Sequence, residues 1–341
     1  MNSKIPWYSA DGVYIIAEIG GNHEGDFEYA KKLTQLACES QADCIKFQIY
    51  TGDSLVSKVE APDRNQHFKK FQLSTEHYIE LKNICHSYGK NFGASVWDIE
   101  AIDWIAPHLT FFKIGSGDLT AFPVLKEVAQ TNKPIMLSTG LATLEEIKET
   151  VHFLQTLNPL YKSRENLSIL QCTSMYPIPN CEANLNIIST LKKEFGDYDI
   201  GYSDHTEGKR AVEAAITLGA KILEVHFTDK REGKTFRDHK ISLVKDELIE
   251  LRAFIKEIND LKGNHQKGIT PSELENNHPT TFRRAVYLKN NIKKGQLIQE
   301  SDLIALRPNH GIDARDFTKL IGKRSNKDLL KLKRLDWNDF E

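Results

Sequence analysis

Residue types that can take part in catalysis recur at the ends of short apolar runs along the first three quarters of the sequence. The stretch GYSDHT (201–206) shows the pattern, because serine, aspartate and histidine directly follow such a run. Taken alone, a polar cluster of this kind is typical of a turn that begins a helix. Its recurrence indicates one shared site, with the candidates Glu18, Lys46, Gln48, Ser95, Lys113, Ser116, Asp118, Ser138, Tyr176, Ser203, His205, His226 and Asp238.

Two of these candidates, Lys46 and Lys113, lie inside apolar runs. Burying an unpaired amine is costly, so each lysine must face a polar cavity or meet a carboxylate. Two inward lysines surrounded by hydroxyl groups predict a cradle for a phosphate or a carboxylate. The alternative for each lysine is a structural ion pair, for example with Glu18. The hydroxyl groups are those of Ser95, Ser116, Ser138 and Ser203.

His205 and His226 follow successive runs and would stand beside each other at the ends of adjacent strands. Imidazoles so placed suit a divalent metal, and two protein ligands leave positions open to water and substrate. We expect Asp204 to orient His205. We expect Asp238, next to a third histidine (His239), to hold substrate hydroxyls or to act as a base. The alternative is that the two histidines are polar or helix-capping residues.

The elements that must position these groups are strands alternating with helices. Apolar residues recur with a period near 3.6 in residues 26–40 and 143–157, which predicts helices there. Asp26, Thr143 and Thr206 stand at expected N-cap positions, and Thr143 has a glutamate three residues later, as a capping box requires. The predicted strands are residues 13–18, 44–48, 92–95, 111–116, 134–138, 167–172, 199–203 and 221–227.

Alternating strands and helices imply a parallel sheet with helices outside it. The eightfold count favours a closed (β/α)8 TIM barrel over an open doubly wound sheet, and no G-x-G-x-x-G motif follows the first strand. In such barrels the reacting groups lie at the C-terminal ends of the strands, where the candidates occur. Residues 51–75 predict an inserted loop, and such insertions often form part of a site.

The domain organisation changes near residue 262. We expect a barrel domain at 1–262, a linker at 263–281 that is rich in polar residues, and a small C-terminal domain at 282–341. The last segment shows short strands broken by turns. A core of about sixty residues is marginal by itself, so this domain is expected to lean on another surface, in its own subunit or in a partner.

Composition excludes several other classes of protein. A hydrophobic fraction of 40% and a charged fraction of 27% are typical of a soluble globular chain. The net charge of −2 argues against binding to nucleic acid or to an acidic membrane. No apolar run predicts a membrane span or a signal peptide. The five cysteines have no C-x-x-C pairing, which predicts reduced thiols in a cytoplasmic protein. Among them, Cys172 is interpreted as a small buried thiol.

An ordered set of motifs resembles the sialic acid synthases and related enzymes that make nonulosonic acids from phosphoenolpyruvate. The C-terminal segment is similar to the antifreeze-like SAF domain of that family, a small β-rich, β-clip-like fold. The resemblance covers nearly the whole chain. It is carried by AEIGGNHEGD (17–26), IKFQ (45–48), FKIGSGDLTAFPVL (112–125), KPIMLSTGLATLEEI (133–147), LQCTSMYP (170–177), GYSDHT, EVHFT (224–228), DHKISL (238–243), RRA (283–285), IKKGQ (292–296) and ALRPNHGI (305–312).

The resemblance implies a transferase that joins phosphoenolpyruvate to an open-chain N-acylated amino sugar and releases phosphate. His205 and His226 would hold a divalent ion, commonly manganese in the family, with magnesium and cobalt as alternatives. Glu18, Lys46, Lys113 and Asp238 would be the catalytic residues, with Glu18 handling a proton. Phosphoenolpyruvate would lie over Lys46, Ser95, Lys113, Ser116, Ser138 and Ser203.

The resemblance also implies how the sugar is held. Gln48, Tyr176 and Asp238 would line its pocket, and Asp118 would face its amide. Arg307 would reach the sugar from the SAF domain of a second subunit, which predicts a domain-swapped homodimer. The expected sugars are N-acetylmannosamine or a 2,4-diacetamido-2,4,6-trideoxyhexose.

Three segments depart from the family pattern, namely GGNH (20–23), GASVWD (93–98) and KTFRDHK (234–240). Two other functions remain open at this point. One is a condensation of phosphoenolpyruvate with a phosphorylated sugar, as in octulosonate phosphate synthesis. The other is a non-catalytic protein that binds carbohydrate or ice through its antifreeze-like segment.

Overall fold

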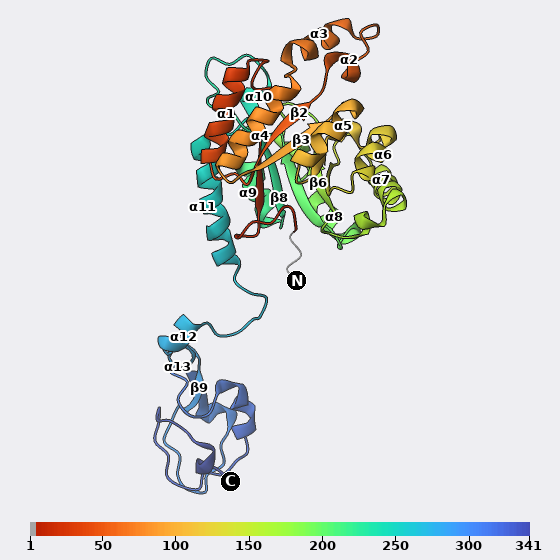
Figure 1. Ribbon diagram of the computed structural model, residues 1–341. Coiled ribbons are helices and arrows are strands. Elements are labelled where there is room, and N and C mark those ends of the chain that lie inside the picture. Colours follow the sequence, from red (N-terminus) through yellow and green to blue (C-terminus); the bar gives the residue numbers. More distant parts are fainter. Residues whose placement is uncertain (1–4) are drawn as a thin grey trace. The chain divides into compact units, whose positions relative to one another are not determined.

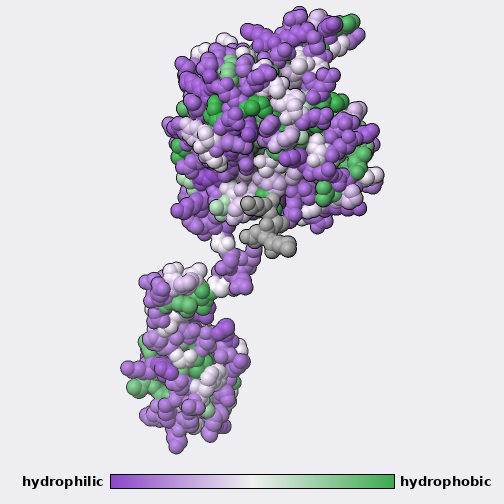
Figure 2. Space-filling view, in the orientation of Figure 1, coloured by the Kyte–Doolittle hydropathy of each residue, from purple (hydrophilic) through white to green (hydrophobic). Residues whose placement is uncertain are grey.

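The computed structural model describes residues 5–341, and these form two compact units (Figure 1). The first unit ends at Gly263 and the second runs from Asn264 to Glu341. Among the described residues, no helix is both long and apolar enough to cross a membrane. Hydrophilic side chains cover most of the visible face of each unit, as Figure 2 shows.

The first unit is a closed barrel of eight parallel strands, which confirms the predicted (β/α)8 fold. Each strand pairs with the next along the chain, and β8 closes the ring by pairing with β1. Every strand begins and ends within two residues of its predicted bounds. The strands are β1 (Tyr14–Glu18), β2 (Cys44–Ile49), β3 (Asn91–Val96), β4 (Phe112–Ile114), β5 (Ile135–Ser138), β6 (Leu167–Cys172), β7 (Asp199–Asp204) and β8 (Ile222–His226).

Helices surround the barrel and bury their apolar faces against the outer side of the strands. The main helices are α1 (Phe27–Glu39), α4 (Thr75–Ser87), α5 (Ile99–Ile105), α6 (Phe122–Gln130), α7 (Leu144–Leu157), α8 (Ile187–Glu194), α9 (Arg210–Thr217) and α11 (Lys245–Lys262). Short 3₁₀ helices occur at Ala106–His108, Ser116–Asp118, Pro159–Lys162, Asn180–Glu182, Glu300–Asp302, Ala314–Leu320 and Trp337–Asp339.

Two of the three expected helix caps are confirmed. Asp26 accepts a hydrogen bond from the backbone N–H of Tyr29 at 3.0 Å, and Thr143 forms the expected capping box at the start of α7. The expectation that Thr206 caps a helix is wrong, because α9 begins only at Arg210. The N–H and hydroxyl of Thr206 both donate to Asp204, at 2.9 and 3.1 Å, and stabilise a turn.

The inserted segment between β2 and β3 is helical instead of an irregular loop. It contains α2 (Gly52–Leu55) and α3 (Pro62–Phe71), which project from one end of the barrel (Figure 1). Proline at the first position of α3 and Thr51 before α2 are residues that favour helix starts. Another short helix, α10 (Asp238–Ile241), follows β8.

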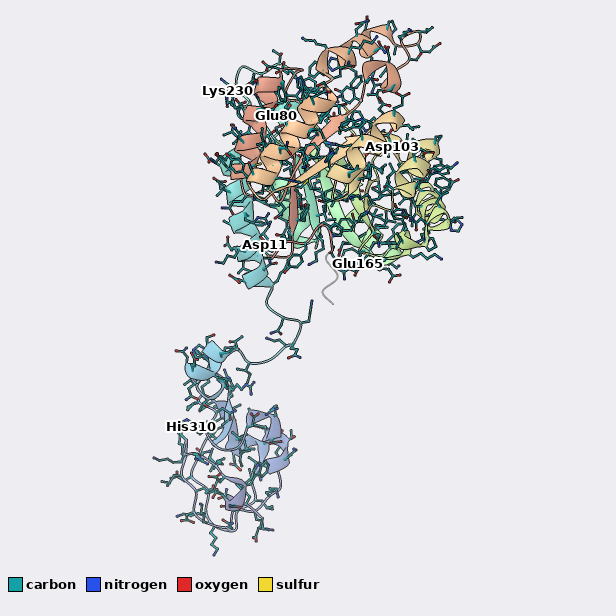
Figure 3. The ribbon with its side chains drawn as sticks, in the orientation of Figure 1. Asp11, Glu80, Asp103, Glu165, Lys230 and His310 are labelled. Carbon is teal, nitrogen blue, oxygen red and sulfur yellow. The ribbon has the colours of Figure 1, made fainter. Side chains whose placement is uncertain are left out.

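The inside of the barrel changes from apolar to polar along the strands. Its N-terminal half is filled by large apolar side chains, and the inward positions two residues further along several strands are charged or hydroxylated. Lys230, just after β8, lies at the opposite end of the barrel from Asp11, just before β1 (Figure 3). The apolar layer consists of Trp7, Tyr14, Ile16, Cys44, Phe111, Met136, Leu170 and Ile222.

The second unit has its own small core. Its two strands, β9 (Ala285–Leu288) and β10 (Leu303–Leu306), pair antiparallel, and isolated bridges connect the remaining turns. The segment predicted as a linker contains two short helices, α12 (Pro271–Glu275) and α13 (His278–Phe282). The core residues are Val286, Leu288, Ile292, Ile298, Leu303, Ile312, Leu320, Leu329, Leu335 and Phe340.

Candidate active site

A layer of charged side chains fills the barrel near the C-terminal ends of its strands. Lys46 donates to Glu18 at 2.7 Å and pairs with Glu224 at 3.1 Å. Lys113 pairs with the other oxygen of Glu224 at 3.2 Å. All four side chains are buried. The ion pair of Lys46 with Glu18, named above as the alternative for this lysine, therefore exists, and it belongs to a larger network that joins both lysines.

Hydroxyl groups complete this layer. Lys113 donates to Ser138 at 2.6 Å, and Ser203 donates to Glu224 at 2.9 Å. Because Ser138 ends β5 and Ser203 lies beside Glu224 in the sheet register, both hydroxyls come from the barrel wall. Ammonium and hydroxyl groups so clustered are suitable donors for a phosphate or carboxylate.

The two carboxylates of this network differ in pKa. Burial would raise the pKa of Glu224, but Lys113 and Lys46 hold it well below its usual range, so Glu224 stays ionised. Burial raises the pKa of Glu18 in spite of the pull of Lys46. Glu18 therefore keeps a proton to higher pH than an exposed glutamate, which makes it the carboxyl of this network better suited to exchange a proton.

Glu224 was missed in the sequence analysis, although the motif EVHFT contains it. The signal was available, because Glu224 stands two residues before His226 in the same strand and must share its face. Since a carboxylate between two inward lysines also neutralises their charge, Glu224 is the central residue of the network.

His205 and His226 lie side by side, with ring centroids 5.4 Å apart. Nδ1 of His205 donates to the carbonyl of Thr173 at 2.9 Å, which leaves the Nε2 lone pair for another ligand. Burial lowers the pKa of His226 to about 4, so its imidazole is neutral at pH 7. Its buried Nδ1 has no hydrogen-bond partner among residues 5–341.

Burial would lower the pKa of His205, but Cys172 raises it, so only His226 is held neutral by its surroundings. Two adjacent imidazoles, each with one ring nitrogen that no other described side chain binds, still fit a divalent metal, which would favour the neutral form of both. No group of three or more His, Cys, Asp or Glu side chains in the described part of the chain has the arrangement of a metal site. The protein would therefore supply two imidazoles, and water or substrate would supply the other ligands.

One expectation about a neighbouring residue is wrong. Asp204 does not orient His205, because its Oδ1 accepts instead from the hydroxyl of Tyr202 at 2.9 Å and from the Thr206 N–H. The carbonyl of Thr173 takes that role. His239 does not join the histidine pair, since it contacts Thr228 and Glu24.

One side of the site's rim is formed by Tyr176, Arg237 and Asp238. The Tyr176 ring lies 4.0 Å from the His205 ring, measured between centroids. Asp238 Oδ2 lies 3.9 Å from Nδ1 of His226, and Asp238 Oδ1 accepts from Nε of Arg237 at 2.9 Å. The Arg237 guanidinium also lies 4.3 Å from the Tyr176 ring centroid. A carboxylate, a phenol and a cation therefore stand beside the histidine pair.

The remaining candidates contact the charged layer or the loops that follow the strands. Gln48 donates to Glu18 at 2.9 Å, and the buried Ser95 lies beside Gln48 and Lys113 in the sheet register. Ser116 accepts from the backbone N–H of Gly140 at 3.0 Å. The buried Cys172 contacts His205, with Sγ 3.8 Å from Nδ1.

Arg307 is exposed and belongs to the second unit. Its guanidinium lies 5.5 Å from the ring centroid of Phe282, within the same unit.

Asp118 should make the stability of the protein depend on pH. Burial raises the pKa of Asp118 to about 6 from 3.8, against the pull of Lys113. The folded state therefore binds this proton more tightly, and its advantage is lost as pH rises through about 6. We expect Asp118→Asn to stabilise the protein at pH 7 by about 2 kcal/mol and to have little effect near pH 4. Urea unfolding at several pH values measures this difference.

The control for that experiment is Asp103→Asn, which changes an exposed carboxyl on α5 (Figure 3). A constant difference between Asp118→Asn and the unchanged protein from pH 4 to pH 7 would contradict the prediction.

The family of the chain is established by comparison with known proteins. Residues 33–267 match the NeuB family, and residues 283–341 match the SAF domain. The chain is 38% identical to the N,N'-diacetyllegionaminic acid synthase of Campylobacter jejuni, over 92% of this chain and 96% of that one. It is 33% identical to the human N-acetylneuraminate-9-phosphate synthase, over 91% of this chain and 88% of that one.

A solved structure agrees with these sequence matches. The N-acetylneuraminic acid synthetase of Leptospira borgpetersenii superposes with a TM-score of 0.71 at 29% identity, over 78% of this chain and 90% of that one. The predicted resemblance to sialic acid synthases is thus confirmed. The chain belongs to the NeuB family, is an enzyme of the synthase type, and ends in a SAF domain.

Proposed function

We propose that this enzyme condenses phosphoenolpyruvate with an open-chain N-acylated amino sugar to give a nonulosonic acid and phosphate. The observation that carries the proposal is that two buried lysines and a pair of adjacent histidines lie in one ring of strands. In that ring Glu18 lies beside both Lys46 and His226 in the sheet register. The synthases named above supply the reaction class.

Phosphoenolpyruvate would bind to the charged layer. Its phosphate and carboxylate require several donors, and the lysines and hydroxyls of this layer provide them. Glu224 would balance the lysine charges so that the site is not strongly positive before the substrate enters. The proposed ligands are Lys46, Ser95, Lys113, Ser116, Ser138 and Ser203.

The aldehyde of the sugar would face the histidine pair. His205 and His226 would hold a divalent ion, for which we propose manganese, and the bound ion would supply Lewis-acid polarisation of the aldehyde. Gln48, Asp118, Tyr176 and Asp238 would contact the sugar's hydroxyl and amide groups. We further propose that the enzyme is a cytoplasmic homodimer in which Arg307 of a second copy completes the sugar site.

In the reaction, a bond forms between C3 of phosphoenolpyruvate and the aldehyde carbon. Water adds at C2, and the bond from C2 to the phosphate oxygen breaks. The water oxygen becomes the carbonyl oxygen at C2, so water gives up two protons: one ends on the former aldehyde oxygen and the other on the departing phosphate. Glu18 would hold and return the first of these protons, because burial raises its pKa and it accepts a hydrogen bond from Lys46 in the charged layer. The lysines would hold the phosphate as its negative charge grows.

The proposal is tested by incubating the full-length protein with manganese, phosphoenolpyruvate and a set of sugars. The set contains N-acetylmannosamine, a 2,4-diacetamido-2,4,6-trideoxyhexose and N-acetylmannosamine 6-phosphate. We expect equal amounts of phosphate and nonulosonic acid with one of the unphosphorylated sugars, measured by phosphate assay and mass spectrometry. Preference for the sugar phosphate would overturn the substrate class, and absence of a condensed product with all three sugars would overturn the reaction.

A further inference from the structure

Gly21, in the turn that follows β1, leaves room for the ring of Phe236. A Cβ atom at Gly21 would lie 2.9 Å from Cζ of Phe236 and 3.0 Å from its Cε1, closer than real Cβ atoms approach. The same atom would lie 3.5 Å from Cδ1 of Phe71. Because Gly21 is buried, an added methyl group could be accommodated only if the Phe236 ring moved.

Phe236 belongs to an aromatic cluster that joins two segments far apart in the sequence. His67 and Phe71 come from α3, in the insertion between β2 and β3, and Phe236 comes from the segment after β8. The ring centroids of Phe71 and Phe236 are 5.0 Å apart, and those of His67 and Phe71 are 4.4 Å apart. These separations are typical of attractive aromatic pairs. The aromatic cluster (His67, Phe71 and Phe236) thus connects the inserted helix to the segment after β8.

The residues that follow Phe236 reach the rim of the active site. Arg237 is 64% exposed, so burial does not fix its position, yet it donates to Asp238 and covers the Tyr176 ring. Asp238 is buried 3.9 Å from His226. The backbone position of this short stretch therefore decides where a carboxylate and a guanidinium stand beside Tyr176 and the histidine pair.

We infer that Phe236 is a positioning residue, which through the contact with Gly21 and Phe71 sets Arg237 and Asp238 against Tyr176 and so determines how the amino sugar is bound. The inference rests on the proposed function for the identity of that substrate. Phosphoenolpyruvate would be held by the lysine layer, whose residues come from the barrel strands, whereas the aromatic cluster comes from α3 and the segment after β8. Displacing Phe236 should therefore affect the two substrates unequally.

The test uses the full-length variants Gly21→Ala, Phe236→Leu and the double variant. Leucine lacks the outer ring atoms that a Cβ at Gly21 would meet. We expect Gly21→Ala to raise KM for the amino sugar about tenfold, since small displacements of positioning groups cost this much or more. We expect KM for phosphoenolpyruvate to change less than about twofold. In the Phe236→Leu background, Gly21→Ala should have no further effect, because the two residues act through one contact.

A second measurement does not depend on catalysis. Trypsin should cleave after Lys234 and Arg237 about tenfold faster in Gly21→Ala, because the segment opens more often when its packing is lost. The matched control is Phe122→Leu, which removes a half-buried ring stacked on Phe153 at 4.2 Å between α6 and α7. It should alter neither the two KM values nor cleavage at these sites.

The outcomes separate this inference from the proposed function. A protein that condenses no sugar would overturn the proposed function, while the trypsin result still decides whether Phe236 holds the segment. Unchanged cleavage in Gly21→Ala, an equal rise of both KM values, or additive effects in the double variant would each overturn the inference.

Discussion

Replacing Glu224 with glutamine should destabilise the protein by about 3–5 kcal/mol, the usual cost of removing one partner from a buried ion pair. The change keeps the shape of the side chain but leaves Lys46 and Lys113 with Glu18 as the remaining carboxylate of their network. Turnover should also fall by at least about a hundredfold, because both lysines lose the group that fixes their positions. Urea unfolding and phosphate release measure the two effects.

A second change distinguishes lost charge balance from lost packing. The double variant Glu224→Gln with Lys113→Met removes one charge of each sign, so it should recover part of the lost stability. The control is Glu80→Gln, because Glu80 is exposed and its pair with Lys31 spans 3.5 Å (Figure 3). Exposed pairs contribute about 0–1 kcal/mol. A Glu224→Gln variant as stable as Glu80→Gln would show that the network does not need its central carboxylate.

Removing both imidazoles, in the variant His205→Ala with His226→Ala, should lower kcat/KM by about a thousandfold. A metal that polarises a carbonyl lowers the activation barrier by several kcal/mol, and each 1.36 kcal/mol corresponds to a factor of about ten in rate. The variant should also lose manganese binding, which paramagnetic resonance of the free ion measures without any reaction. The two rings lie 5.4 Å apart, so a single ion can reach both.

The control for the histidine variant is His152→Ala, which changes an exposed histidine on α7. It should bind manganese and turn over substrate like the unchanged protein. If the double variant retained both properties, the assignment of the metal to His205 and His226 would be wrong.

The barrel could be predicted from the sequence because its eight strands are short, apolar and separated by periodic helices. Strands that are buried on both faces are nearly continuous apolar runs, so they are easy to recognise. Because all strands of the barrel are parallel, their C-terminal ends must meet at one face. The inward direction of Lys46 and Lys113 followed from the cost of burying an amine among apolar residues. Their partner Glu224 is not among the predicted site residues, although the alternation of side chains along β8 places it on the same face as His226.

Other features could not be read from local patterns. The position of Thr206 in the sequence is typical of a helix cap. In the structure its N–H and hydroxyl donate to Asp204 in a turn, and a turn of this kind has no periodic sequence pattern by which it could be predicted. The insertion of residues 51–75 looks irregular because α2 is short and the faces of α3 are mostly polar. Phe71 of this insertion contacts Phe236, which is separated from it in the sequence by more than half the length of the barrel domain, so no local pattern predicts the contact. The need for glycine at position 21 follows only from the nearby ring of Phe236, which the sequence does not place there.

The apolar side chains in the N-terminal half of the barrel determine from which end ligands can enter and leave. Trp7 donates to Asp199 at 3.1 Å and packs edge-on against Phe111, which also meets Tyr14 edge-on, so this end is plugged by large rings. Whatever reaches the lysines must arrive and depart through the opposite opening. A ligand bound at the lysine layer cannot dissociate while a second ligand occupies the opening at the C-terminal ends of the strands. The ligand that binds deepest therefore binds first and dissociates last.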